Sequence, residues 1–274
     1  MTYNLEFKRK ERKYLIIEHS FEEIKQALEK YMPVHIFNGN NPVSHIQTTY
    51  FDSKDFLLFK EYINRRKFRF KIRIRRYCRE ENCNDDNLVE LKIKHNSVSY
   101  KKRFHLPIDL LEPFLKGEDI TNEIRHKNKF LSREQKTYKI IRTLILKNNL
   151  VPVLQTSYER VAFQKEKALV RVTIDRNINH QKLLGCSKQD NLDAIMLESK
   201  IKGKIPVWNK KMVNKLSLLR QRRFSKYATG INSIYFPERG KYNFDLDEST
   251  IIEKIPACID ESFELLNKTF KIDN

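Results

Sequence analysis

The stretch RKFRFKIRIRRY, residues 66–77, holds the densest set of side chains able to do chemistry in this 274-residue chain. Five cations alternate with apolar residues, at Lys67, Arg69, Lys71, Arg73 and Arg75. A period of two is typical of a β-strand, whose successive side chains point to opposite faces. Like charges on one strand face repel one another, so they require an anion from the protein or from a ligand. We therefore predict an anion site along this face.

Other segments of the chain repeat this alternation of charged and aliphatic residues. They are RKERKYLII (9–17), LVELKIK (88–94), VLQTSYERVAF (153–163), LVRVTID (169–175) and IMLESKI (195–201). A closed antiparallel barrel of about eight strands would gather the charges in its lumen and leave no exposed edge. We therefore predict an α+β fold, with helices packed on the apolar outside of such a barrel.

The lining of that barrel would combine many cations with a few carboxylates. The cations are Lys13, Arg73, Arg75, Lys92, Arg160 and Arg171, and the carboxylates are Glu11, Glu90 and Glu198. Arginine and lysine hold phosphate oxygens, and arginine can do so bidentately. Carboxylates hold a divalent metal that bridges phosphates and offsets developing charge. This mixture predicts phosphoryl chemistry.

Some charged residues have simpler interpretations. We predict a solvated rim for Lys67, Arg69 and Lys71, because runs of charge are usually exposed. Glu90 is equally consistent with a metal ligand and with a structural ion pair to Lys92. Asp52 and Asp175 stand where predicted strands end, so we assign them turn or capping roles.

The overall charge agrees with an anionic partner. Lysine and arginine number 54 against 35 acidic residues, a formal net charge of +19, which predicts a polyanionic ligand or surface. The first residues contain no apolar segment typical of a signal peptide, and no run reaches the ~18 apolar residues that span a bilayer. We expect a cytoplasmic protein without a transmembrane segment, and association with a membrane partner protein stays open.

Eight segments, taken together and in order, resemble the VTC (vacuolar transporter chaperone) catalytic domain, a branch of the triphosphate tunnel metalloenzymes related to the CYTH proteins. They are RKERKY (9–14), TTYFD (48–52), KIRIRRY (71–77), VELKIK (89–94), SYERVAF (157–163), VRVTID (170–175), MLESKIKG (196–203) and FSKYATG (224–230). No single segment is diagnostic of the family, but the occurrence of all eight in the family's order is strong evidence for it. We accordingly divide the chain into a VTC-like domain, residues 1–230, and a C-terminal helical extension packed on it, residues 231–274.

The resemblance implies a tunnel that grips a triphosphate, uses Mn²⁺ or Mg²⁺, and transfers the γ-phosphate of ATP to growing inorganic polyphosphate. The phosphate ligands it implies are Lys13, Arg73, Arg75, Lys92, Arg160, Arg171 and Lys226, with Lys101, Arg103, Lys200 and Ser225 as weaker candidates. Glu198 would be the main metal ligand, with Glu11 and Glu90 as further candidates. Tyr158 would supply an orienting hydroxyl.

One departure from the wider family bears on the reaction. The CYTH signature ExExK reads RKERK at residues 9–13, so a basic residue replaces the first carboxylate. This favours the VTC branch over a two-metal triphosphatase. Two alternatives stay open: hydrolysis of tripolyphosphate or nucleoside triphosphates on the same scaffold, and non-catalytic binding of polyphosphate or RNA. Because Phe68 and Phe70 fall on the face opposite the cations, they cannot stack bases held there, and we predict no specific nucleic acid.

Overall fold

The structure, a computed structural model, describes residues 9–242 apart from 37–40, 80–81, 97, 127–130, 165–169 and 222–223. Its strands are β1 (Arg9–Ile16), β2 (Val43–Asp52), β3 (Phe68–Arg79), β4 (Asn82–His95), β5 (Val98–Leu106), β6 (Val151–Gln164), β7 (Val170–Lys182), β8 (Gln189–Leu192) and β9 (Ile195–Lys202). Its α-helices are α1 (Phe21–Glu29), α2 (Leu57–Ile63), α3 (Leu111–Lys116), α4 (Thr121–His126), α5 (Ser132–Lys147), α6 (Val207–Lys215) and α7 (Lys226–Tyr235). Two 3₁₀ turns, η1 (Ile108–Leu110) and η2 (Pro237–Arg239), complete the described elements.

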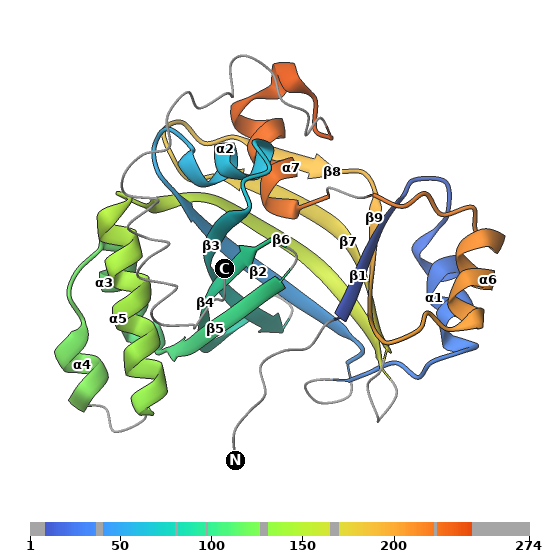
Figure 1. Cartoon of the computed structure of the whole chain (residues 1–274), viewed down its shortest axis with the longest axis horizontal. Helices are drawn as coiled ribbons and strands as arrows, with labels where there is room; N and C mark the ends of the chain where they lie inside the picture. Colours follow the sequence, from blue (N-terminus) through green and yellow to red (C-terminus); the bar gives the residue numbers. More distant parts are fainter. Residues whose placement is uncertain are drawn as a thin grey trace.

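The strands form a single antiparallel sheet in the order β1-β9-β7-β6-β2-β3-β4-β5, with β8 paired to β7 (Figure 1). Helices on its outside make the fold α+β, as predicted. The sheet is not closed into a barrel, however: β1 and β5 are its edges, and no ladder joins them within the described residues. Alternation in a sequence reports which face a side chain takes, but not whether the outermost strands meet. The predicted barrel is therefore corrected to an open, curved sheet.

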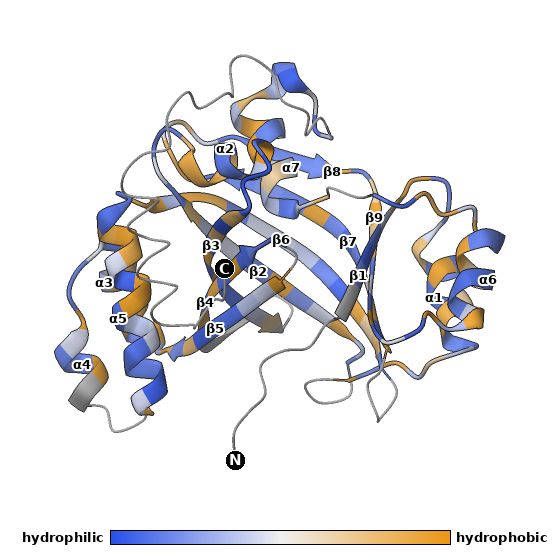
Figure 2. Ribbon diagram, in the orientation of Figure 1, coloured by the Kyte–Doolittle hydropathy of each residue, from blue (hydrophilic) through white to orange (hydrophobic). Residues whose placement is uncertain are grey.

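The register of the ladders separates a charged face from an apolar face. Lys71 lies opposite Lys92, Arg73 opposite Glu90, and Lys13 opposite Glu198, so these groups share one face. We call it the charged face. The intervening residues, such as Ile72 and Leu91, point the other way and are fully buried. Figure 2 shows the resulting alternation of hydrophilic and hydrophobic residues along the strands.

Helices bury the apolar face in two separate areas, at opposite sides of the molecule in Figure 1. One cluster joins residues of β3, β4 and β5, including Phe104, to Phe114 of α3 and Ile141 of α5. The other joins residues of β6, β7 and β9, including Val172, to Ile24 of α1 and Met212 of α6. Removal of this apolar surface from water stabilises the sheet and fixes which face remains for charged groups.

The charged face is concave. Glu11 on β1 and Lys92 on β4 influence each other's pKa electrostatically, although five strands separate β1 from β4 in the sheet order. Lys13 of β1 and Lys71 of β3 also reach adjacent residues: Lys13 Nζ donates to the Phe224 carbonyl oxygen at 3.2 Å and Lys71 Nζ to Ser225 Oγ at 3.0 Å. The sheet must curve strongly to bring these strands together. The curved open sheet therefore brings the charged side chains close together, as we expected a closed barrel to do.

Helices α2 and α7 cover one end of the charged face. Tyr50 of β2 and Leu154 of β6, both on this face, pack with residues of α7 in one cluster. Asp52, at the end of β2, accepts hydrogen bonds from the backbone N–H groups of Leu58 (2.7 Å) and Phe59 (2.9 Å) at the start of α2. It also accepts one from the Tyr227 hydroxyl of α7. The predicted capping role of Asp52 is confirmed, and the same carboxylate links α2 to α7.

Gly230 allows α7 to lie directly on β6 and β7. A Cβ atom at this position would lie 2.7 Å from His180 Nδ1 and 2.7 Å from Leu154 Cδ2. His180 is fully buried, and its Nδ1 is hydrogen-bonded to the Thr156 hydroxyl at 3.0 Å, so the ring cannot shift freely. The glycine therefore sets how closely α7 approaches the sheet.

We expect Gly230→Ala to lower the free energy of unfolding by about 1–3 kcal/mol, the usual effect of overpacking, although alanine favours helices. Urea unfolding followed by circular dichroism measures this. Ser233→Ala, a buried site of the same helix where no volume is added, is the control and should have the smaller effect. Equal stability of Gly230→Ala and the wild type would contradict this packing.

The predicted boundary at residue 230 falls inside α7, whose helix continues to Tyr235. Residues 243–274 lie outside the described part of the chain, so the C-terminal helical extension stays a prediction. Among the described helices, none combines the length and apolar character needed to cross a membrane.

Candidate functional site

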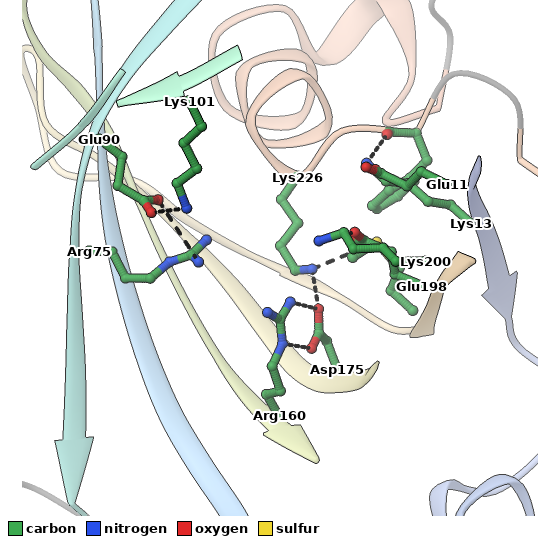
Figure 3. A network of polar contacts seen from close by, with 12 residues as sticks. Glu11, Lys13, Arg75, Glu90, Lys101, Arg160, Asp175, Glu198, Lys200 and Lys226 are labelled. Carbon is green, nitrogen blue, oxygen red and sulfur yellow. Dashed lines mark hydrogen bonds and ion pairs between the residues drawn. The ribbon is translucent and has the colours of Figure 1, made fainter. Parts of the chain in front are cut away.

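Three groups of ionised side chains lie on the charged face (Figure 3). The first surrounds Glu90 of β4, whose side chain is 1% exposed. Arg73 of β3 donates from Nε to its Oε2 at 2.7 Å, Arg73 Nη2 lies 2.7 Å from the same oxygen, and Lys101 of β5 pairs with Oε1. Burial alone would raise the pKa of Glu90, but Arg73, Arg75 and Lys101 hold it well below its usual range. Glu90 is thus an ionised counter-ion shared by cations from three strand positions.

This environment bears on the two roles considered for Glu90. Both of its oxygens are already engaged by cations, and Arg75 Nη1 lies a further 4.0 Å from Oε2. A divalent metal would have to displace these partners. Of the two interpretations, the structure shows an ion pair, although with Arg73 and Lys101 rather than with the expected Lys92.

The second group surrounds Asp175, which is fully buried in β7. Arg160 of β6 binds it bidentately, with Nε to Oδ1 at 2.6 Å and Nη2 to Oδ2 at 2.8 Å. Lys226, the first residue of α7, donates to Oδ2 as well. Burial raises the pKa of Asp175, but the fields of Arg160 and Lys226 outweigh it and lower the pKa overall. Asp175 therefore holds two candidate phosphate ligands in place, Arg160 from the sheet and Lys226 from a helix.

The predicted turn or capping role of Asp175 is wrong. Strand β7 continues seven residues past it to Lys182, supported by pairing with both β6 and β8. The run RNINHQK that follows Asp175 is polar, which locally favours the end of a strand at Asp175. Tertiary pairing overrides that local signal.

The third group brings two carboxylates together. In the β1–β9 ladder, Glu11 lies opposite Lys200 and Lys13 opposite Glu198. Lys13 Nζ is 3.1 Å from Glu11 Oε1, and Lys200 Nζ is 2.7 Å from Glu198 Oε1. After burial, the field of Glu198 is the largest effect raising the pKa of Glu11, and nearby lysines lower it more. The two carboxylates are thus close enough to repel each other.

Such a pair fits a hard divalent cation, because Mg²⁺ and Mn²⁺ take oxygen ligands and Mg²⁺ is often held by one or two carboxylates plus substrate phosphates. No cluster of three or more acidic, histidine or cysteine side chains suited to a metal occurs in the described part of the chain. Glu11 and Glu198 could therefore hold a metal only together with oxygens from a phosphate ligand or water. Glu90 forms its ion pairs with Arg73 and Lys101 elsewhere on the charged face, and its role as a metal ligand stays a prediction.

Lys71 differs from its prediction as a rim residue. It points into the charged face, where it donates a 3.0 Å hydrogen bond to Ser225 Oγ. Its strand neighbour Arg69 lies nearer the rim, with Nη1 donating to the Arg66 carbonyl oxygen, and Lys67 is exposed as predicted. The alternation that places Arg73 inward also places Lys71 inward, so the signal was present in the sequence.

Tyr158 lies within the charged face rather than at its edge. The Arg160 guanidinium lies 5.2 Å and the Lys226 ammonium 4.5 Å from its ring centroid. Burial raises the pKa of its hydroxyl, but Arg160, Arg75 and Lys226 lower it further, so the net direction is downward. The hydroxyl is thus surrounded by positive charge, which suits contact with an anion.

The remaining predicted residues occupy the same face at different depths. Arg171 lies opposite Lys200 in the β7–β9 ladder, and burial and the nearby Arg160 lower its pKa. Arg103 lies opposite Glu90 on the edge strand β5, where it is exposed. Sequence reasoning missed Asp175, Lys71 and the tyrosines Tyr62 and Tyr227. Period-two spacing could have found the first two. Tyr227 stands in the quoted segment FSKYATG, but nothing in the sequence indicated a role for either tyrosine in the site.

The fold and site define an α+β protein that collects cations and a pair of carboxylates within a curved antiparallel sheet. The chain belongs to the VTC domain family, because the family model matches residues 8–235. It is 24% identical over 274 residues to vacuolar transporter chaperone complex subunit 4 of Schizosaccharomyces pombe, covering 84% of this chain and 38% of that protein. It is 24% identical over 226 residues to the subunit of the same name of Trypanosoma brucei brucei, covering 70% and 28%.

The chain thus spans about a third of the length of these curated relatives. Among solved structures, a putative adenylate cyclase from Bacillus halodurans matches 82% of this chain and 96% of its own, with 17% identity and a TM-score of 0.47.

Proposed function

We propose that this chain is a metal-dependent polyphosphate polymerase that transfers the γ-phosphate of ATP to a growing inorganic polyphosphate chain. The observation that carries the proposal is the convergence of cations from several strands around the neighbouring carboxylates Glu11 and Glu198. Lys226 of α7 joins the same face through Asp175. Membership of the VTC family and likeness to subunits of a transporter chaperone complex support it, and extend it to a partner protein at a membrane.

The residues present would contribute mainly by positioning and by electrostatics, as phosphoryl transfer requires. Lys13, Lys92 and Arg75 would hold phosphate oxygens, while Arg73 and Arg160 are oriented in advance by Glu90 and Asp175. Preorganised cations in a partly dehydrated site stabilise developing negative charge without moving at the moment of reaction. A Mn²⁺ or Mg²⁺ ion held by Glu198 and Glu11 would supply further neutralisation of phosphate charge.

Binding of single-stranded nucleic acid is less well supported. Phe70 is buried in the core of the apolar face and Phe68 packs against that core, so neither can stack on a base at the charged face. Tyr158 does lie on this face, but its ring is next to Arg160 and Lys226. These contacts favour a compact, highly charged ligand over stacked bases.

Incubation of the purified chain with ATP and Mn²⁺ tests the proposal. We expect ADP release together with an acid-stable polymer of phosphate. Orthophosphate as the sole phosphate product would instead identify a hydrolase on the same scaffold. Absence of both products, with RNA binding that salt abolishes, would support a binding module in place of an enzyme.

A further inference from the structure

Lys71 lies between two tyrosine rings at the covered end of the charged face. Its Nζ is 4.5 Å from the ring centroid of Tyr62 on α2 and 5.0 Å from that of Tyr227 on α7. Its hydrogen bond goes to Ser225 Oγ, in the residue that precedes α7. An ammonium group has three N–H donors, so this contact uses one of them. In the described part of the chain, no carboxylate forms an ion pair with Lys71.

The lack of a carboxylate partner for Lys71 is unusual, because several positively charged groups face it from the neighbouring elements. The titratable and charged groups around it are Arg69 and Arg73 of β3, Lys92 of β4, Lys13 of β1, Tyr62 of α2 and Tyr227 of α7. Burial, followed by the fields of Lys92, Lys13, Arg69 and Arg73, lowers the pKa of Lys71 well below its ordinary value. Lys92, whose pKa is lowered first by burial, lies directly opposite it in the β3–β4 ladder.

Four other cations of this face are compensated by carboxylates of the protein. Glu90 neutralises Arg73 and Lys101, and Asp175 neutralises Arg160 and Lys226. Directly opposed residues of an antiparallel pair have Cβ atoms about 5 Å apart, and like charges at that spacing destabilise the sheet. Within the described residues neither Lys71 nor Lys92 forms an ion pair. Lys92 is exposed and lies in the fields of Glu11 and Glu198, whereas no carboxylate is among the main effects on Lys71. Lys71 is therefore the member of this pair that lacks an anion of its own.

We propose that Lys71 is a phosphate ligand, and that Lys71 and Lys92 together form a seat for one phosphoryl group of the bound triphosphate. This inference rests on the proposed function for the nature of the ligand. Two opposed ammonium groups present several donors to one anion with several acceptor oxygens, as a phosphoryl group has. The rings of Tyr62 and Tyr227 lie beside the Lys71 ammonium, and such contacts hold a cation in place.

Binding at this seat should be coupled to uptake of a proton. The free site disfavours the charged form of Lys71, whereas an adjacent phosphate favours it, so its pKa rises on binding. A proton is then taken up at every pH between the pKa of the free site and that of the complex. Affinity consequently falls as the pH rises through this range. An arginine at the same position would stay charged throughout and would take up no proton.

Calorimetry with inorganic tripolyphosphate, at about pH 8 in two buffers of different ionisation enthalpy, measures affinity and proton uptake together. We expect Lys71→Met to weaken binding by about 10- to 100-fold, the value of one or two charged hydrogen bonds. Lys71→Arg should bind within a few-fold of the wild type but take up fewer protons. Lys67→Met, which removes the same charge from an exposed position of the same segment, is the matched control and should leave proton uptake unchanged.

The outcomes separate this inference from the proposed function. If the wild-type chain does not bind tripolyphosphate, the proposed function fails and the inference fails with it. If the wild type binds and Lys71→Met binds equally well, the inference alone is overturned. Thermal unfolding establishes that each variant is folded. Should Lys71→Met not fold, undiminished proton uptake by Lys71→Arg would still overturn the inference.

Discussion

Asp175→Asn is expected to lower the free energy of unfolding by about 3–5 kcal/mol, because it leaves two buried cations without their counter-ion. Asp175 is fully buried and engages Arg160 through two hydrogen bonds, and Lys226 through a third. The amide has nearly the same shape as the carboxylate, so the change in packing is small and the loss is electrostatic. Chemical denaturation of the two chains at neutral pH measures the difference.

The neighbouring residues of the same ladder provide a matched control. Glu159 and Arg176 are the adjacent register pair on the opposite face, with Arg176 Nε 2.7 Å from Glu159 Oε2. Both side chains are partly exposed, at 21% and 35%. Glu159→Gln should therefore change stability by less than about 1 kcal/mol. A similar loss of unfolding free energy in both variants would show that burial does not make the Asp175 ion pairs more important for stability.

The contribution of Asp175 should also depend on pH in a defined direction. Its pKa is lowered in the folded chain, so the unfolded chain binds a proton more readily. Stability from this group is fully present above its unfolded pKa of about 4 and is lost as the pH falls through the folded value. The difference between wild type and Asp175→Asn should accordingly be constant near neutrality and shrink in acid.

Catalysis should respond differently from binding. Asp175→Asn frees Arg160 and Lys226 to move but increases the net positive charge of the site, so affinity for tripolyphosphate should stay within a few-fold. Misplacement of catalytic contacts by about 1 Å can reduce turnover by about 100-fold, and we expect kcat to fall by that order with little change in KM. A rise in KM at constant kcat would instead assign Asp175 to ligand binding alone.

The chemistry of the charged face could be predicted from sequence because it follows the two-residue period of a strand. Arg73, Lys92, Arg160 and Glu198 lie on one face as predicted, because alternation fixes the face independently of how strands are ordered. The same rule would have placed Lys71 inward. The rim prediction for Lys71 rests on the general exposure of charge runs, which takes no account of the helices that cover this strand.

The pairing of charges could not be predicted in the same way. Glu90 is linked to Lys101 and Asp175 to Arg160 by contacts between adjacent strands, and these depend on the register of the ladders. Register follows from turns, bulges and core packing, none of which a single alternating segment specifies. The shift in register between β6 and β7 at Ser157 and Glu159 is an example. Whether the sheet closes into a barrel could not be predicted either, because pairing of the outermost strands also depends on register.

The carboxylates differ in whether they are free to bind a metal, and this leads to the second large effect. Glu198 and Glu11 repel each other across the β1–β9 ladder, each opposed by one lysine, whereas Glu90 is neutralised by Arg73 and Lys101. Repulsion between two carboxylates is relieved by a divalent cation, but a carboxylate already paired with two cations gains little. The metal requirement should therefore depend on the first pair.

Glu198→Gln is expected to raise the Mn²⁺ concentration for half-maximal activity by at least about 10-fold and to lower kcat by about 100-fold or more, since a metal contributes several kcal/mol to charge stabilisation. Glu11→Gln should shift the metal requirement in the same direction. Mn²⁺ binding in the presence of tripolyphosphate, followed by electron paramagnetic resonance, gives a readout independent of turnover. Glu90→Gln is the control: it should destabilise the fold by removing the partner of Arg73 and Lys101, yet leave the Mn²⁺ midpoint unchanged. An equal shift of the midpoint in Glu90→Gln would restore Glu90 as a metal ligand and require its ion pairs to open when metal and phosphate bind.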